Sequence, residues 1–159
     1  MTNRRLVPIL VAVVLMAAAC SDDTPTRGED GRLTSAGELS VFDLRPGDCL
    51  IIDETLEPVN ETLPVVPCED EHQAEVYSLV EVDDLDAYPG ERELANRAEH
   101  ECIREFPDYV GVDLVDSELF YTYMIPSIRS WQDDADRTVV CIAMAAGRPL
   151  EGSVEGSGL

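Results

Sequence analysis

Four of the five cysteines of this chain lie far apart in its central part, at Cys49, Cys68, Cys102 and Cys141. Disulfides between them would fix which segments pack together, so they constrain the fold more than any other sequence feature. Cysteines form lasting disulfides mainly in proteins that have left the reducing cytosol. The first twenty residues, which end at the fifth cysteine, indicate whether this chain is exported.

The N-terminus has the three parts of a secretory signal peptide. A basic start with Arg4 and Arg5 precedes 14 apolar residues at positions 6–19, which end in three alanines directly before Cys20. A helix that spans a bilayer needs about 20 apolar residues, so this run is too short for a permanent anchor. We therefore predict that residues 1–19 are a signal peptide removed on export.

Small residues followed at once by cysteine, here 17–19 and Cys20, resemble the lipobox of bacterial lipoproteins. Lipoboxes usually have leucine where this chain has Ala17. The resemblance implies that Cys20 becomes the mature N-terminus and carries diacylglycerol, with acyl chains such as palmitate. Two acyl chains hold a protein stably on a membrane. We expect a lipoprotein on the outer face of the cell membrane; the alternative is a secreted protein with a free Cys20.

The charge of the chain excludes one large class of partners. It carries 33 Asp and Glu residues against 11 Lys and Arg, which gives a formal net charge of -22 at pH 7. Such a charge repels phosphate backbones, and the arginines form no basic stripe, so nucleic-acid binding is excluded. Because 45% of the residues are apolar, the chain still has enough hydrophobic residues for a folded core.

Composition divides the mature chain into three parts. Residues 20–40 are polar and rich in turn formers, which predicts a flexible acidic tether. Residues 41–152 contain the apolar patterns of one folded domain. Residues 153–159 are rich in glycine and serine, which predicts a disordered tail.

The apolar patterns of the domain predict an α+β fold, with a mostly antiparallel sheet of about five strands and one packed helix. An apolar spacing of four from Leu94 to Phe106 predicts an amphipathic helix at 91–106 that ends before Pro107. Alternation in the third strand puts Glu75 and Tyr77 on its outer face. The last strand is apolar on both faces, which predicts a central position. The strands are expected at 49–52, 63–66, 74–82, 119–124 and 138–144.

The four central cysteines allow three disulfide pairings. Cys49 and Cys68 flank a predicted hairpin, whereas Cys102 lies on the inner face of the helix and Cys141 on the buried last strand. The pairing Cys49–Cys68 with Cys102–Cys141 therefore needs the least rearrangement. Zinc is the competing interpretation, but the chain has no Cys-x-x-Cys and the spacings are wide, which disfavours a metal centre.

Several short pieces accompany the cysteines in order: Gly47-Asp48-Cys49, Val66-Pro67-Cys68, His72, Glu75-Val76-Tyr77, Tyr88-Pro89-Gly90, Cys102, Pro126, Trp131, Arg137, Cys141 and Gly152-Ser153. Together they resemble the septum formation domain of actinobacterial envelope proteins, over about residues 40–155. The resemblance implies a link to cell division but no established reaction.

Two residues are candidates for a catalytic site, and several others are candidates for binding a partner. His72 and Glu75 are a possible acid–base pair of an extracytoplasmic hydrolase, but no nucleophile motif accompanies them, so we assign no catalytic residue and expect no enzyme. A third hypothesis is divalent-metal binding by the acidic clusters, although none follows the EF-hand spacing. We expect a non-catalytic domain without a cofactor that binds a protein or a cell-wall component. Its candidate binding residues are His72, Glu75, Tyr77, Tyr121 and Trp131.

Overall fold

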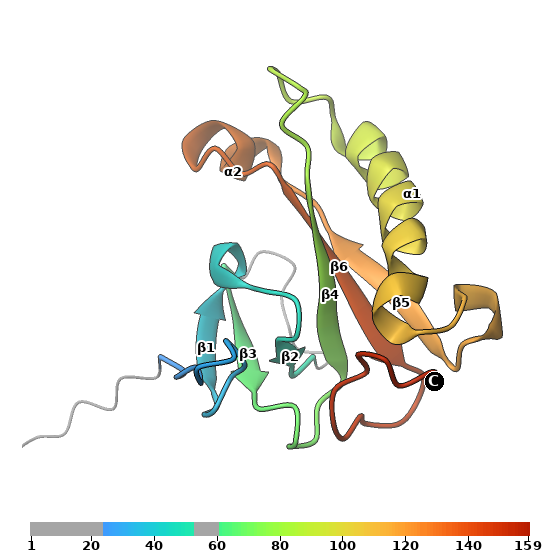
Figure 1. The fold of residues 1–159 in the computed structure, drawn as a ribbon. Coiled ribbons are helices and arrows are strands. Elements are labelled where there is room, and N and C mark those ends of the chain that lie inside the picture. Colours follow the sequence, from blue (N-terminus) through green and yellow to red (C-terminus); the bar gives the residue numbers. More distant parts are fainter. Residues whose placement is uncertain (1–23, 53–60) are drawn as a thin grey trace, which may run out of the picture.

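The computed structural model describes residues 24–52 and 61–159, which form a six-stranded antiparallel sheet with one long helix against it (Figure 1). The order across the sheet is β1-β3-β2-β4-β6-β5. Its strands are β1 (Gly37–Ser40), β2 (Cys49–Leu50), β3 (Thr62–Val66), β4 (Ala74–Glu81), β5 (Leu119–Met124) and β6 (Thr138–Ala145). The helices are α1 (Glu91–Val110), the short α2 (Ile128–Asp133) and the 3-10 turns η1 (Val41–Asp43) and η2 (Leu114–Asp116).

These observations confirm the predicted α+β class and both predicted disulfides. Cys49 is bonded to Cys68, which joins β2 to the segment after β3, and Cys102 is bonded to Cys141, which joins α1 to β6. Cys20, the signal peptide and most of the predicted loop between β2 and β3 lie outside the described residues. None of the helices within the described part of the chain is long and apolar enough to cross a membrane.

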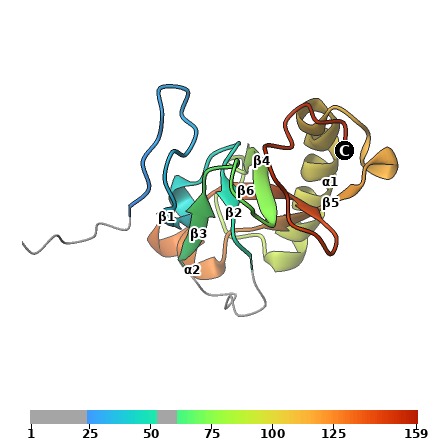
Figure 2. The same ribbon diagram turned by 90° about the horizontal axis from the view of Figure 1, so that it is seen from below.

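The two faces of the sheet are covered differently. Figure 2 shows α1 on one side of β4 and β6, with β1, β3 and α2 on the other side. The larger core lies under α1, where the buried helix residues Leu94, Ala98, Cys102, Phe106 and Val110 pack on β4 and β6. A smaller core lies on the opposite face, and β6 contributes to both because its side chains alternate, as predicted.

The helix does not end before Pro107, as the sequence predicted, but continues to Val110. Proline inside a helix removes one backbone hydrogen bond, at a cost of about 3 kcal/mol. The spacing-of-four series continues to Val110, which is fully buried, and that burial offsets much of the cost. Gly111 then ends the helix in a left-handed conformation, with its N–H donating to the Pro107 carbonyl.

The predicted tether and tail were wrong for the residues that the structure describes. Leu33 and Leu39 are buried in the smaller core, and β1 pairs with β3, so the segment from residue 24 onward packs on the domain. At the other end, Val154 is buried, and the amides of Gly156 and Gly158 donate to carbonyls of α1. A few apolar residues are enough to order both segments, because Leu33, Leu39 and Val154 each enter a core.

The predicted outer face of β4 was also wrong, because a bulge interrupts the strand. The register of β4 against β6 shifts between Val76 and Ser78, so the alternation of side chains reverses there. Glu75 and Tyr77 consequently face the α1 side and are both buried. Leu79, on the other side of the bulge, packs on the opposite face.

Candidate binding groove

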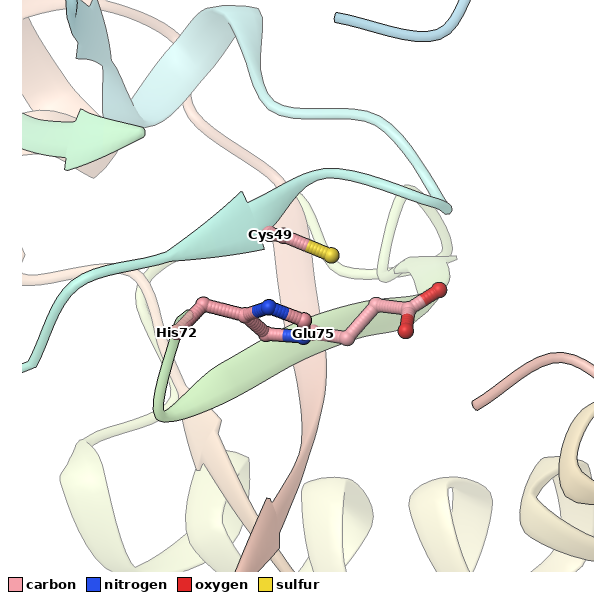
Figure 3. Close-up of side chains that lie close together, drawn as sticks. All are labelled: Cys49, His72 and Glu75. Carbon is pink, nitrogen blue, oxygen red and sulfur yellow. The ribbon is translucent and has the colours of Figure 1, made fainter. Parts of the chain in front are cut away.

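The predicted acid–base pair is buried beside a disulfide. Cys49, His72 and Glu75 are fully buried and place one ligand-type atom each within 4.8 Å of one another, and Figure 3 shows the three side chains side by side. The Glu75 carboxylate in that view points away from the imidazole ring. His72 and Glu75 are therefore neighbours, as the acid–base hypothesis requires, but they lie in the interior of the domain.

The Glu75 carboxylate accepts three hydrogen bonds within the domain. Its Oε1 accepts from the hydroxyls of Tyr109 and Ser153, both at 2.7 Å, and its Oε2 accepts from the backbone N–H of Val154 at 2.6 Å. These donors come from α1 and from the C-terminal segment. Three donors stabilise a buried carboxylate, so Glu75 joins β4, α1 and the C-terminus.

His72 is held by its backbone as well as by its ring. Its backbone forms an isolated antiparallel bridge with Leu150, and its Nδ1 lies 2.9 Å from the Asp70 carbonyl oxygen, to which it donates as the Nδ1–H tautomer. Nε2 is buried and has no hydrogen-bond partner among the described residues. Cys49 cannot act as a thiolate while it is bonded to Cys68, so the three residues do not form a metal centre in this state.

The environment of Tyr109 makes the stability of the domain sensitive to pH in the alkaline range. Burial, and secondly the hydrogen bond to Glu75, raise the pKa of the Tyr109 phenol, and burial raises the pKa of Tyr77 as well. In the unfolded chain both phenols lose their protons near pH 10, so the unfolded state binds fewer protons above that pH. The free energy of unfolding is expected to fall as the pH rises above about 10. Urea unfolding at several pH values measures this fall.

Tyr109→Phe provides the control for this pH dependence. The variant removes one of these two phenols, both of which have a raised pKa, so its stability is expected to fall less steeply above pH 10 than that of the wild type. Equal slopes for the variant and the wild type would contradict the role given to Tyr109.

Two of the three aromatic residues predicted to bind a partner are buried. Tyr77 is 3% exposed and its hydroxyl donates to the Cys102 carbonyl at 2.7 Å. Trp131 is 4% exposed, with the Arg137 guanidinium stacked 3.6 Å from its ring centroid. Tyr121 is half-buried against the larger core. These aromatic side chains, which the sequence suggested as a recognition surface, stabilise the fold.

An open groove lies instead on the face of the sheet opposite α1, with a volume of about 930 Å³. Its floor crosses three neighbouring strands, because Val140 of β6 is in register with Leu79 of β4 on one side and with Met124 of β5 on the other. η1 forms one wall, where Phe42 is 50% exposed, and the segment around α2 forms the other. No local sequence pattern predicts this groove, because the bulge determines which β4 residues face it.

The rim of the groove is acidic. Arg129 and Arg137 are its two cations. Arg137 donates to the carbonyls of Trp131 and Asp136, whereas Arg129 is exposed and lies 3.6 Å from Glu61. Carboxylates outnumber them. The acidic lining residues are Glu61, Glu81, Asp83, Asp134 and Asp136.

The fold and the groove define a class: a small α+β domain with two disulfides and an apolar-floored acidic groove on the sheet face opposite α1. A family model described as septum formation matches residues 23–146, which is most of the chain. The chain therefore belongs to the septum formation family, as the resemblance implied. No curated protein and no solved structure matches it.

Proposed function

We propose that this protein is a non-catalytic binding domain that is held on the outer face of the cell membrane and takes part in septum formation. Membership of the septum formation family supports a role in cell division or in the cell envelope. The observation that carries the binding role is the groove, in which a partly exposed apolar floor lies within an acidic rim. Exposed apolar surface bordered by polar residues is typical of a site that binds a partner.

The positions of His72 and Glu75 favour binding over hydrolysis. A general base must come within hydrogen-bond distance of a substrate, whereas both side chains are fully buried and the Glu75 oxygens already accept three hydrogen bonds. The residues that line the groove include neither histidine nor cysteine.

Septal accumulation in dividing cells tests the proposed function. A fluorescent fusion of the full-length chain is expected to concentrate at the division site, and a His72→Asn variant, which keeps a hydrogen-bonding side chain, is expected to do the same. Fluorescence imaging of both strains gives the result. An even distribution around the envelope, together with a hydrolytic activity that the variant lacks, would favour the enzyme hypothesis.

Membrane attachment of the domain is expected to depend on lipidation of Cys20. The apolar run before Cys20 is too short to anchor the chain, so membrane attachment requires acyl chains on this residue. The intact mass of the protein from the membrane fraction should correspond to an acylated chain that begins at Cys20. Cys20→Ala should release the protein or block its processing. A mature chain that begins elsewhere would contradict this prediction.

A further inference from the structure

The floor of the groove has the geometry of a site for an extended peptide. Leu79, Val140 and Met124 form an apolar row across three adjacent strands, and Phe42 adds a half-exposed ring at one wall. α1 does not cover this face (Figure 2). Side chains of an extended segment alternate between two sides, so every second residue of a bound peptide can lie on such a floor.

The acidic rim of the groove favours a partner with positive charge. Five carboxylates line the groove against two arginines, and one of these, Arg137, is held by contacts within the domain. Asp83 and Asp134 are exposed on the rim, where cationic side chains can reach them. Complementary charge speeds association and excludes partners of the wrong sign, so an acidic segment would be repelled.

We infer that the groove binds an extended segment of another envelope protein in which basic and apolar side chains alternate. The apolar side chains lie on the floor, and the lysine or arginine side chains reach the rim carboxylates. A neutral sugar polymer fits this site less well, because its hydroxyls would lose water over an apolar floor and gain nothing from the excess of carboxylates. The inference rests on the proposed binding function and specifies its partner.

A direct binding measurement tests the inference with the full mature chain. The probe is a synthetic peptide of alternating leucine and lysine, compared with peptides of alternating leucine and glutamate and of alternating serine and lysine. Isothermal titration should show binding of the first peptide alone. Its affinity should fall as salt rises, because salt screens the contacts at the rim.

Paired variants locate the site. Asp83→Asn with Asp134→Asn is expected to weaken binding about five- to tenfold, since rim charges control association. Asp113→Asn with Asp116→Asn changes the net charge equally but lies outside the groove, so it should change affinity less than about twofold. Phe42→Ser should weaken binding, whereas Phe120→Ser, a residue with 42% exposure outside the groove, should not.

Three outcomes would overturn the inference: equal binding of the glutamate peptide, equal losses in the groove variants and their controls, or tight binding of soluble wall glycan fragments without binding of the peptide. Failure of the inference is distinguishable from failure of the proposed function. If the peptide does not bind but the fusion still accumulates at the septum, only the partner chemistry is wrong. If the peptide binds but the fusion is evenly distributed, the septal role is wrong.

Discussion

Replacing both Cys102 and Cys141 by alanine is expected to lower the free energy of unfolding by about 4 kcal/mol. The disulfide closes a loop with a sequence separation of 39 and joins α1 to the central strand β6. Without it the unfolded chain gains conformational freedom, and both cysteines leave space in the core under α1, where they are fully buried. Urea unfolding of the purified domain under non-reducing conditions measures the difference.

The second disulfide provides a matched comparison for this variant. Cys49 and Cys68 close a shorter loop with a sequence separation of 19, so the corresponding double alanine variant should lose about 3 kcal/mol from loop closure. A loss below about 1 kcal/mol in the Cys102 and Cys141 variant would show that α1 is held without the bond. A urea midpoint of the wild type that does not change when its disulfides are reduced would show the same.

Glu75→Ala is expected to lower the free energy of unfolding by about 3 to 5 kcal/mol. The substitution leaves the hydroxyls of Tyr109 and Ser153 and the amide of Val154 without their acceptor. Val154 is buried, so water cannot easily replace the lost carboxylate at its amide. Hydrogen exchange should show lost protection of the Val154 amide, because the C-terminal segment separates from β4.

Glu81→Ala on the same strand is the control, because Glu81 is exposed and its removal should change stability by less than about 0.5 kcal/mol. Ser153→Ala removes one donor and leaves the carboxylate with two, so its effect should lie between the other two. If Glu75→Ala were as mild as Glu81→Ala, the buried carboxylate would not be what joins the C-terminus to the sheet.

The features that the sequence predicted well depend on local patterns with strong physical causes. The spacing of four in α1 places Cys102 on the buried face, and the apolar residues of β6 on both faces place Cys141 in the centre of the sheet. A helix face and a central strand in one small core bring these two cysteines together. This explains why the positions of the cysteines in the helix and strand patterns were enough to predict the pairing.

The features that the sequence did not predict depend on contacts between distant segments. The bulge after Val76 reverses which β4 side chains face the helix, and it buries Tyr77 and Glu75. β1 is only four residues long and is stabilised by pairing with β3 and by the burial of Leu39. Neither feature has a local signal. The groove depends on both features, because Leu79 after the bulge in β4 contributes to its floor and η1, which directly follows β1, forms one wall.

The central claim, that this domain acts by binding a partner in the groove, is tested most directly by photo-crosslinking in dividing cells. A photoreactive phenylalanine analogue replaces Phe42, which lines the groove, or Phe120, which has similar exposure outside it. The Phe42 position should capture an envelope protein through a segment that mass spectrometry shows to be basic and apolar, and the Phe120 position should not. Equal capture at both positions, or none at Phe42, would contradict the account.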